Sequence, residues 1–486
     1  MCLKKDVYRN VKWNWLLFWV ALAMPALSWA AEWSVSPSLT LSETYTNNVN
    51  IGGTGNEQSE FITQINPAIS LNGTGRRLRL DLSYNMQNVL YAKNDSRNTT
   101  FHQLRAHALA TLVEDTLFVD TSASIGQQAI SLRESAPVDN LTLSNNRTDA
   151  ITFHISPYLR HAFGDVATTE LRYGYDKTHY EATGFGSESN AYSARITSGS
   201  TFKTFPWGLG YSQQDTPTSK QGASAVKFET YTADLRYVAS RKLIFTTSGG
   251  YEDNEYGTSL QRKPSGAFWN AGLIWSPSGR TSLQASYGKR FFGNNYALNA
   301  KHATRRSTWN LSYTENITTI NTLRPENRIF MISDGAGGVF IDPQTGLPIL
   351  VSLIIPTLTN DVYISKRWQT AMGYKLKRND FNFSLFNERR LFGGSGELQR
   401  VQGANVSWGL QLAPHSNLSI NSGSQNIKYS LDNQADDFWH IGMTLNHAIQ
   451  HDVKGAIEFR HAVRNSNNSI NESTENRIVA RLTVTF

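Results

Sequence analysis

The stretch RLRLDLSYNMQ (Arg77–Gln87) places an apolar side chain at every second position. The apolar residues share one face of an extended strand: Leu78, Leu80, Leu82, Tyr84 and Met86. The polar residues share the other face: Arg77, Arg79, Asp81, Ser83, Asn85 and Gln87. This period of two is typical of a strand with one face in an apolar medium and the other in water. Because hydrocarbon cannot pair backbone N–H and C=O groups, strands cross a membrane only within a closed barrel.

The same alternation recurs along the chain, in ELRYGYD (Glu170–Asp176), YTADLRY (Tyr231–Tyr237) and the residues around Ile457. A soluble β-sandwich would give each single strand the same pattern. The number and length of the segments separate the two classes, since soluble strands usually have about 5–6 residues and a tilted transmembrane strand needs about 9–11. The segments here have the transmembrane length and recur to the end of the chain with no helical domain between them.

The chain ends in RIVARLTVTF (Arg477–Phe486), where Ile478, Leu482 and Phe486 lie on one apolar face and Arg481 on the other. A terminal aromatic residue on an amphipathic strand resembles the signal that the barrel-assembly machinery reads, so Phe486 is the expected assembly signal. Ten short and eleven long polar connections separate the strand-like segments, which predicts 22 strands within a range of 18–22. With short turns in the periplasm, both termini lie there. Gly293–Asn295 is expected to be a long-side connection, and Phe205–Trp207 a short turn.

The first 30 residues predict a secretory signal peptide. Basic residues from Lys4 to Lys12 precede an apolar run, and Ser28-Trp29-Ala30 offers a cleavage site before Ala31. The remainder, residues 31–486, is expected to be a single barrel. The signal carries a net charge of +3, which leaves +4 of the formal +7 for the mature chain, without a basic block of the nucleic-acid-binding kind. The only cysteine, Cys2, lies in the signal, so disulfides and cysteine-based sites are excluded.

Five segments resemble a known family: PSLTLSETYTNNVN (Pro37–Asn50), WSPSGRTSLQASYGKRFFGNNYAL (Trp275–Leu298), HATRRSTWNLSYTEN (His302–Asn316), VYISKR (Val362–Arg367) and TENRIVARLTVTF (Thr474–Phe486). They resemble the PEP-CTERM system-associated outer-membrane barrels, which are linked to exopolysaccharide loci in Gram-negative bacteria. The first motif carries Asn47 where the family often has an acid. The resemblance implies a setting in polysaccharide export or surface-protein sorting, and it implies no specific biochemical activity.

Chemistry-bearing residues form no recognisable catalytic or metal motif, so we expect no enzyme, no cofactor and no metal. His102 and His107 have odd spacing on one strand and should face opposite sides. His447 and His451 have helical ligand spacing without a predicted helix. Acid pairs such as Glu114-Asp115 fall at turns, and the glycine-rich Gly52–Gly55 lacks a phosphate-binding lysine. An outer-membrane hydrolase is the enzymatic alternative, with His440 beside Asp436 or Asp437 as its loose candidate.

The polar faces predict a set of charged residues that line the lumen. They are Arg77, Arg79, Asp81, Glu170, Arg172, Asp176, Asp234, Arg236, Lys454, Glu458, Arg460 and Arg481. Such charges either tune selectivity in a water-filled channel or form salt-bridge ladders that fill it. The loop at 317–360 contains the apolar stretch Gly346–Leu358 and is expected to constrict, plug or cap the barrel. Strand-like sequence from Trp33 leaves no N-terminal plug domain, which argues against an energised siderophore-type transporter.

These features predict an outer-membrane, porin-like conduit for exopolysaccharide, with a general small-solute porin and a non-conducting surface scaffold as alternatives. The expected partners are outer-membrane lipid, the barrel-assembly machinery, a polysaccharide and periplasmic export components, with no nucleic acid. Substrate, transport direction and oligomeric state stay open.

Overall fold

A computed structural model describes residues 32–53, 55–131, 133–134, 139–217, 225–259, 263–319, 361–468 and 471–486 of the chain. These residues form 22 strands and two short 3₁₀ turns, η2 (Asp95–Arg97) and η3 (Ser200–Phe202). The strands are β1 (Glu32–Thr46), β2 (Glu60–Thr74), β3 (Leu78–Tyr91), β4 (Thr99–Val113), β5 (Leu117–Gln128), β6 (Thr148–Phe163), β7 (Ala167–Tyr180), β8 (Phe185–Ser198), β9 (Trp207–Thr216), β10 (Val226–Ser240), β11 (Leu243–Glu255), β12 (Ser265–Ser278), β13 (Thr281–Arg290), β14 (Gly293–Ala303), β15 (Ser307–Thr319), β16 (Val362–Leu376), β17 (Asn379–Phe392), β18 (Leu398–Ala413), β19 (Ser416–Tyr429), β20 (Ala435–Ala448), β21 (Val453–Ser466) and β22 (Ser473–Thr485).

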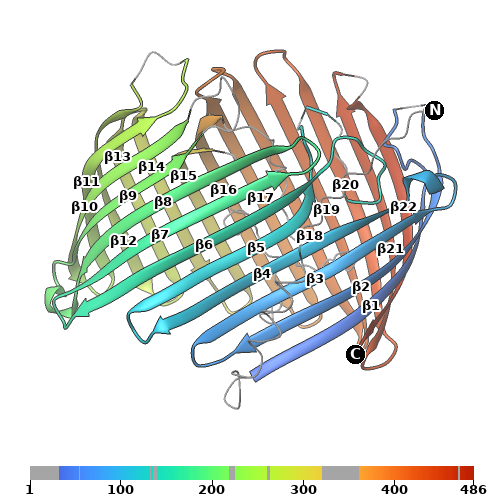
Figure 1. Ribbon diagram of the computed structural model, residues 1–486, viewed down its shortest axis with the longest axis horizontal. Helices are drawn as coiled ribbons and strands as arrows, with labels where there is room; N and C mark the ends of the chain where they lie inside the picture. The colour runs from blue at the N-terminus through green and yellow to red at the C-terminus, as the bar shows by residue number, and fades with distance from the viewer. Residues whose placement is uncertain are drawn as a thin grey trace, which may run out of the picture.

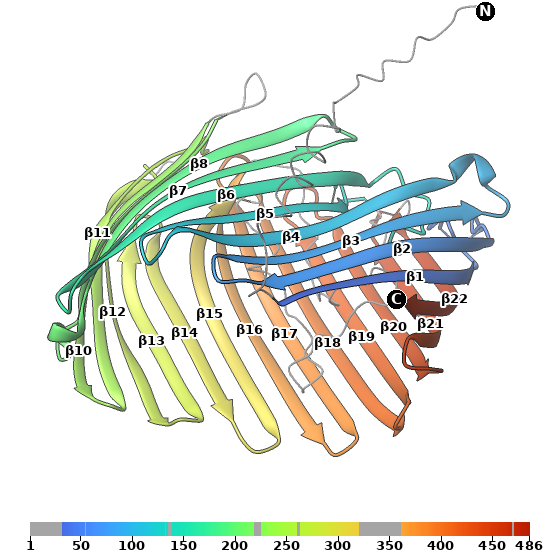
Figure 2. The same cartoon turned by 60° about the horizontal axis from the view of Figure 1, so that its bottom comes forward.

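Each strand pairs antiparallel with its neighbours in the chain, and β1 pairs antiparallel with β22. That last pairing closes the sheet into one up-and-down barrel (Figures 1 and 2). Closure leaves no open sheet edge, which a membrane-spanning sheet requires. The predicted fold and the predicted count of 22 strands are therefore confirmed. No helix among the described residues is long and apolar enough to cross a membrane.

The connections alternate between a short-turn end and a long-loop end, largely as the sequence predicts. Two predicted lengths are wrong. The connection before Gly293 lies at the long-loop end but has only two residues, Phe291 and Phe292, because Gly293 adopts φ +120° and turns the chain tightly. The connection before Trp207 lies at the short-turn end but spans 199–206, where Ser200 Oγ donates to an oxygen of Asp165 at 2.8 Å and holds η3 in place.

The described chain begins and ends at the short-turn end, where the Phe486 N–H donates to the Pro37 carbonyl oxygen at 2.9 Å. The outward face is apolar, since Leu171, Ile457 and Ile478 are 49%, 60% and 52% exposed. Residues at the alternate positions face the lumen. The predicted signal at residues 1–30 and most of the predicted loop at 317–360 lie outside the described residues.

Aromatic side chains form two rows on the outward face. The loop-side row contains Tyr173, Tyr192, Tyr211, Tyr231, Tyr251, Trp269, Tyr287, Tyr296, Tyr313 and Trp368. About half of the neighbouring rings are in direct register, as Tyr173 and Tyr192 are, and others meet diagonally, as Trp269 and Tyr287 do with ring centres 5.6 Å apart. The turn-side row contains Phe205, Tyr237, Phe245, Trp275, Trp309, Tyr374, Phe381 and Trp408.

The two rows stand six residues apart on β10, β11, β12 and β16, as Tyr231 and Tyr237 illustrate. Six residues of strand span about 20 Å, and the side chains between the rows are mainly aliphatic. Transmembrane barrels carry such paired aromatic girdles at the two membrane interfaces. The rows therefore mark the membrane-embedded zone of this barrel.

Candidate functional site: the lumen and its two ends

The segment Asp139–Arg147, from the connection between β5 and β6, lies against the inner wall at the long-loop end. Its Leu141 is fully buried in an apolar cluster with Val49, Ile62, Val89, Tyr91 and Phe101, and Leu143 packs against the same cluster. Two hydrogen bonds hold the segment's backbone in place: the Leu143 N–H donates to the Val49 carbonyl oxygen at 2.7 Å, and the Tyr91 side-chain hydroxyl donates to the Leu141 carbonyl oxygen at 3.1 Å. The segment therefore narrows the barrel beside β1–β4.

Asp139 fixes the start of this segment to β21 and β22. Its Oδ2 lies 3.0 Å from Arg460 Nη1 and also pairs with Arg477, while Glu475 pairs with both arginines. The side chains of Arg477 and Glu475 are only 1% and 4% exposed. Burial alone would raise the pKa of Asp139, but the charges of Arg477 and then Arg460 outweigh burial and hold it well below its usual range. We call these four residues the Asp139 latch.

Arg133, earlier in the same connection, crosses to a different part of the rim. It pairs with Glu397 and Asp432, which belong to the connections before β18 and β20. Its guanidinium lies 4.5 Å from the centre of the Tyr429 ring. The Gln434 N–H donates to Asp432, and this bond together with Arg133 lowers the pKa of that carboxyl.

A second connection crosses the long-loop end from β11 towards β17. The Ser259 N–H donates to the Gly393 carbonyl oxygen at 2.7 Å, and the Ser259 hydroxyl donates to the same oxygen at 3.0 Å. Tyr256 precedes it, and burial raises the pKa of the Tyr256 hydroxyl to about 12. The long-loop end is thus bridged by two connections that the sequence did not single out.

Charged residues on the inner wall near this end are paired. Arg390 Nη2 lies 3.0 Å from Glu388 Oε2, and Arg367 Nη1 lies 3.3 Å from the same atom. Arg464 Nη2 lies 3.2 Å from Asp436 Oδ2. Each of these guanidinium groups meets a carboxylate, and the pairs Arg367–Glu388 and Arg464–Asp436 cross-link neighbouring strands. Three arginines against two acids leave one net positive charge.

The predicted lumen residues lie on the inward face, since the opposite alternation on their strands holds exposed apolar residues such as Leu171, Leu235, Ile457 and Leu482. Their roles as transport residues stay a prediction. Nine of them meet opposite charges or a histidine: Arg79 with Asp81, Glu170 with Arg160 and Arg172, Asp176 with His154, Asp234 with Arg195, Glu458 with Arg481, and Arg460 with Asp139. For Arg77, Arg236 and Lys454, the described residues provide no ion pair.

The two ends differ in charge. The ten connections at the short-turn end carry ten Lys and Arg against four Asp and Glu, a net charge of +6. By sequence, the eleven long-loop connections carry nine Lys and Arg against twelve Asp and Glu, a net charge of −3. The inward cations Arg236, Lys301 and Lys454 extend the positive charge from the short turns into the lumen.

Between the two ends, the inner wall of β11–β19 carries hydroxyl, amide and glycine positions. Its members include Ser248, Asn270, Gln284, Ser286, Asn299, Ser312, Gln369, Ser384, Asn405, Ser407 and Asn421. Between β16 and β17 the direct register partners are apolar, since Gln369 opposes Phe386 and Ser384 opposes Ala371, so the polar surface continues there only through the diagonal neighbours Gln369 and Ser384. We call it the hydroxyl–amide wall. Single-strand alternation places these residues inward, but only the register shows that they are contiguous.

Solved structures share this architecture. The siderophore receptor PirA from Acinetobacter baumannii matches with a TM-score of 0.51 and 8% identity, over 93% of this chain and 80% of that one. A mutant of the ferric enterobactin receptor PfeA from Pseudomonas aeruginosa matches with a TM-score of 0.51 and 9% identity, over 94% of this chain and 81% of that one.

This chain has the barrel fold of outer-membrane receptors. At these identities the likeness concerns the fold alone. The closed barrel and its paired aromatic rows are what support a location in an outer membrane. No family model matches the chain, and no curated protein does.

In the hydrolase candidate, the side chain of His440 contacts neither Asp436 nor Asp437. His440 faces the lumen, and its buried Nδ1 finds no hydrogen-bond partner among the described residues. Asp436 pairs with Arg464, whereas Asp437 lies on the outward face and accepts a bond from Asn426 at 2.6 Å. His102 and His107 contact Tyr84 and Asp120 on opposite faces, as the spacing predicts. In the described part of the chain, no three His, Cys, Asp or Glu side chains gather as metal ligands.

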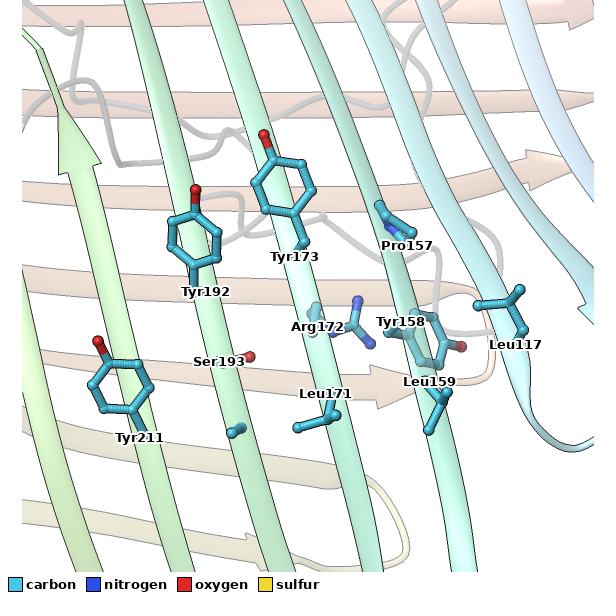
Figure 3. A pocket seen from close by; sticks show the side chains of 11 residues that line it. Leu117, Pro157, Tyr158, Leu159, Leu171, Arg172, Tyr173, Tyr192, Ser193 and Tyr211 are labelled. Atoms are coloured by element: carbon cyan, nitrogen blue, oxygen red, sulfur yellow. The ribbon is translucent and has the colours of Figure 1, made fainter.

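A shallow apolar hollow of about 450 Å³ opens on the outward face of β5–β9. Figure 3 shows Leu171, Tyr173 and Tyr192 along its length, with Leu159 and Leu117 at one side. Leu171 and Tyr192 belong to the exposed apolar surface, so the hollow faces the membrane zone rather than the lumen. It contributes nothing to a path through the barrel.

Proposed function

We propose that this barrel is an outer-membrane conduit that exports a polysaccharide. The hydroxyl–amide wall carries the proposal, because a surface of uncharged donors and acceptors exchanges hydrogen bonds with sugar hydroxyls without holding them tightly. A polymer can then advance by replacing one weak bond with the next. The resemblance to exopolysaccharide-linked barrels supports the same substrate class.

In this proposal, the different charges of the two ends set the direction of polymer transport. With short turns in the periplasm, the end with a net charge of +6 receives the polymer, and its cations attract acidic sugars. The segment Asp139–Arg147 and the Ser259 crossing narrow the exit and keep external solutes out. Transport is passive at the barrel, and we assign it no catalytic step.

Conductance of the purified barrel in planar bilayers tests the proposal. We expect current that uncharged oligosaccharides interrupt, with interruptions that lengthen as the sugar chain grows. Replacing Ser312, Ser384 and Asn405 with valine should shorten those interruptions, while the matched outward change Thr370→Val should not. A large conductance that sugars leave unchanged would support a general porin instead, and a barrel that never conducts would support a scaffold.

A further inference from the structure

Four cations stand side by side on the outward face at the long-loop end. Lys366 on β16 is in register with Arg389 on β17, Arg389 with Arg400 on β18, and Arg400 with Lys428 on β19. Directly opposed residues on neighbouring strands have Cβ atoms about 4.5–5.5 Å apart. We call these four residues the cation row.

The cation row faces away from the lumen. Glu388 and Arg390, on either side of Arg389, are 2% and 1% exposed and face inward. Ile427 and Tyr429, on either side of Lys428, are also buried on the inner side. Arg389, Arg400 and Lys428 themselves are exposed.

Like charges in direct cross-strand register destabilise a sheet. On β7 and β8 the outward face avoids this arrangement, since Lys177 opposes Glu188 with 2.7 Å between Nζ and Oε1. Where Glu229 opposes Asp253, the like charges have partners: Lys227 pairs with Glu229, and the Ser265 hydroxyl donates to Asp253. Acids meet the cation row only at its edges. Glu315 lies 3.1 Å from Lys366, and Asp437 lies one step lower beside Lys428, where it accepts a bond from Asn426. Among the described residues, nothing offsets the charge at the centre of the row.

The outward residues below the cation row change character in the order of a lipid molecule. The next row contains Trp368, Asn387, Gln402 and Asn426, which are an interfacial indole and three amides. Two further steps give Leu385 with Ala404, and then Met372, Phe383 and Val406. Thr370, Ser422 and Ser424 share these rows, and the hydroxyls of Thr370 and Ser422 donate to backbone oxygens of the wall. Tyr374, Phe381 and Trp408 of the turn-side aromatic row follow, about 26 Å along the strands from the cations.

We propose that the cation row binds the phosphate groups of a membrane lipid, with the amide row at the level of its polar linkage and its acyl chains on the apolar rows below. Phosphate oxygens form strong charge-assisted bonds with guanidinium and ammonium groups. An anion between them removes the repulsion that the bare row carries. The site lies just beyond the loop-side aromatic row, to which Trp368 belongs, and this is the height of lipid headgroups. It is independent of what the lumen transports.

Native mass spectrometry of the detergent-solubilised barrel tests this site, with diphosphorylated lipid A and the same lipid without its phosphates as probes. We expect the intact barrel to retain the phosphorylated lipid at least about tenfold better than the variant R389Q/R400Q/K428Q does. The matched control, R241Q/R280Q/K377Q, removes three exposed cations at the short-turn end and should retain the lipid fully. Inorganic phosphate should not displace the lipid at millimolar concentration, because the apolar rows also hold it.

Equal retention by the triple variant, or equal retention of the dephosphorylated lipid, would overturn the proposal. Displacement by inorganic phosphate alone would overturn its lipid part and leave an anion site. Thermal unfolding in lipid-free detergent gives a second readout. Removing the like charges should leave the melting temperature of the triple variant unchanged or higher, whereas a structural role for these three side chains would lower it.

Discussion

The two ends of this barrel contain many arginines but use them in opposite ways. At the long-loop end, Arg390 and Arg477 are almost fully buried, and each meets at least one carboxylate. At the short-turn end, Arg77, Arg236 and Lys454 face water, and the described residues provide no ion pair for them. The buried, paired arginines cross-link strands and help to narrow the long-loop end of the lumen. The exposed cations instead give the short-turn end a positive electrostatic potential. Burial and pairing, rather than residue type, therefore decide what a lumen charge does.

Removing the centre of the Asp139 latch should have the strongest consequence. Arg477→Met leaves Asp139 and Glu475 beside one arginine instead of two. Breaking a buried ion pair costs about 3–5 kcal/mol, so the segment Asp139–Arg147 should leave the wall. Hydrogen exchange at the Leu143 amide, which donates to Val49, would report the loss of protection. The control Arg236→Met at the other end should leave that amide protected, and equal protection in both variants would contradict the latch.

Removing the apolar contacts that hold the segment Asp139–Arg147 against the wall should destabilise its position somewhat less than removing Arg477 does. Leu141 is fully buried against Ile62 and Val89, and Leu141→Ala should cost about 2–4 kcal/mol through lost burial and the cavity left behind. We expect a higher mean conductance in planar bilayers because the narrowed end opens more often. Leu112→Ala, at an exposed outward position, is the matched control. An unchanged conductance with a lowered melting temperature would mean that Leu141 stabilises the barrel without limiting its aperture.

The wall of the barrel follows from the sequence more completely than its closure does. Alternation in Arg77–Gln87 predicts which side chains meet lipid, because every strand obeys the same period of two. Asp139 and Leu141 have no such period around them, and their partners lie on β21–β22 and β2–β4, far away in the chain. The sequence leaves open whether Arg460 is a free selectivity charge or part of a salt bridge. Its partner Asp139 lies far away in the chain, so only the three-dimensional structure shows that the two residues pair. The hydroxyl–amide wall likewise depends on register between strands.

Removing the inward cations at the short-turn end should have a more moderate effect, on the ion selectivity of the barrel. Replacing Arg77, Arg236, Lys301 and Lys454 with glutamine removes four inward cations near the short turns. The chloride-to-potassium permeability ratio, obtained from reversal potentials across a salt gradient, should fall several-fold at low salt. It should fall less at 1 M, where the screening length shrinks to about 3 Å. Neutralising Arg97 and Lys263 at the long-loop end is the comparison. If the chloride-to-potassium permeability ratio changed equally in both variants, the cations at the short-turn end would have no special role in ion selectivity.

The smallest effect should come from pH, and its sign follows from Asp139. Because its pKa in the folded barrel lies below its usual value of about 3.9, the stability it contributes is complete above that value. It is lost only as pH falls through the lower, folded value. Closure of the long-loop end should therefore not change between about pH 5 and pH 8, and conductance should rise only in strong acid. Asp139→Asn should show the acid-like conductance already at pH 7. If conductance of the unaltered barrel instead rose between pH 7 and pH 5, a histidine rather than Asp139 would control closure.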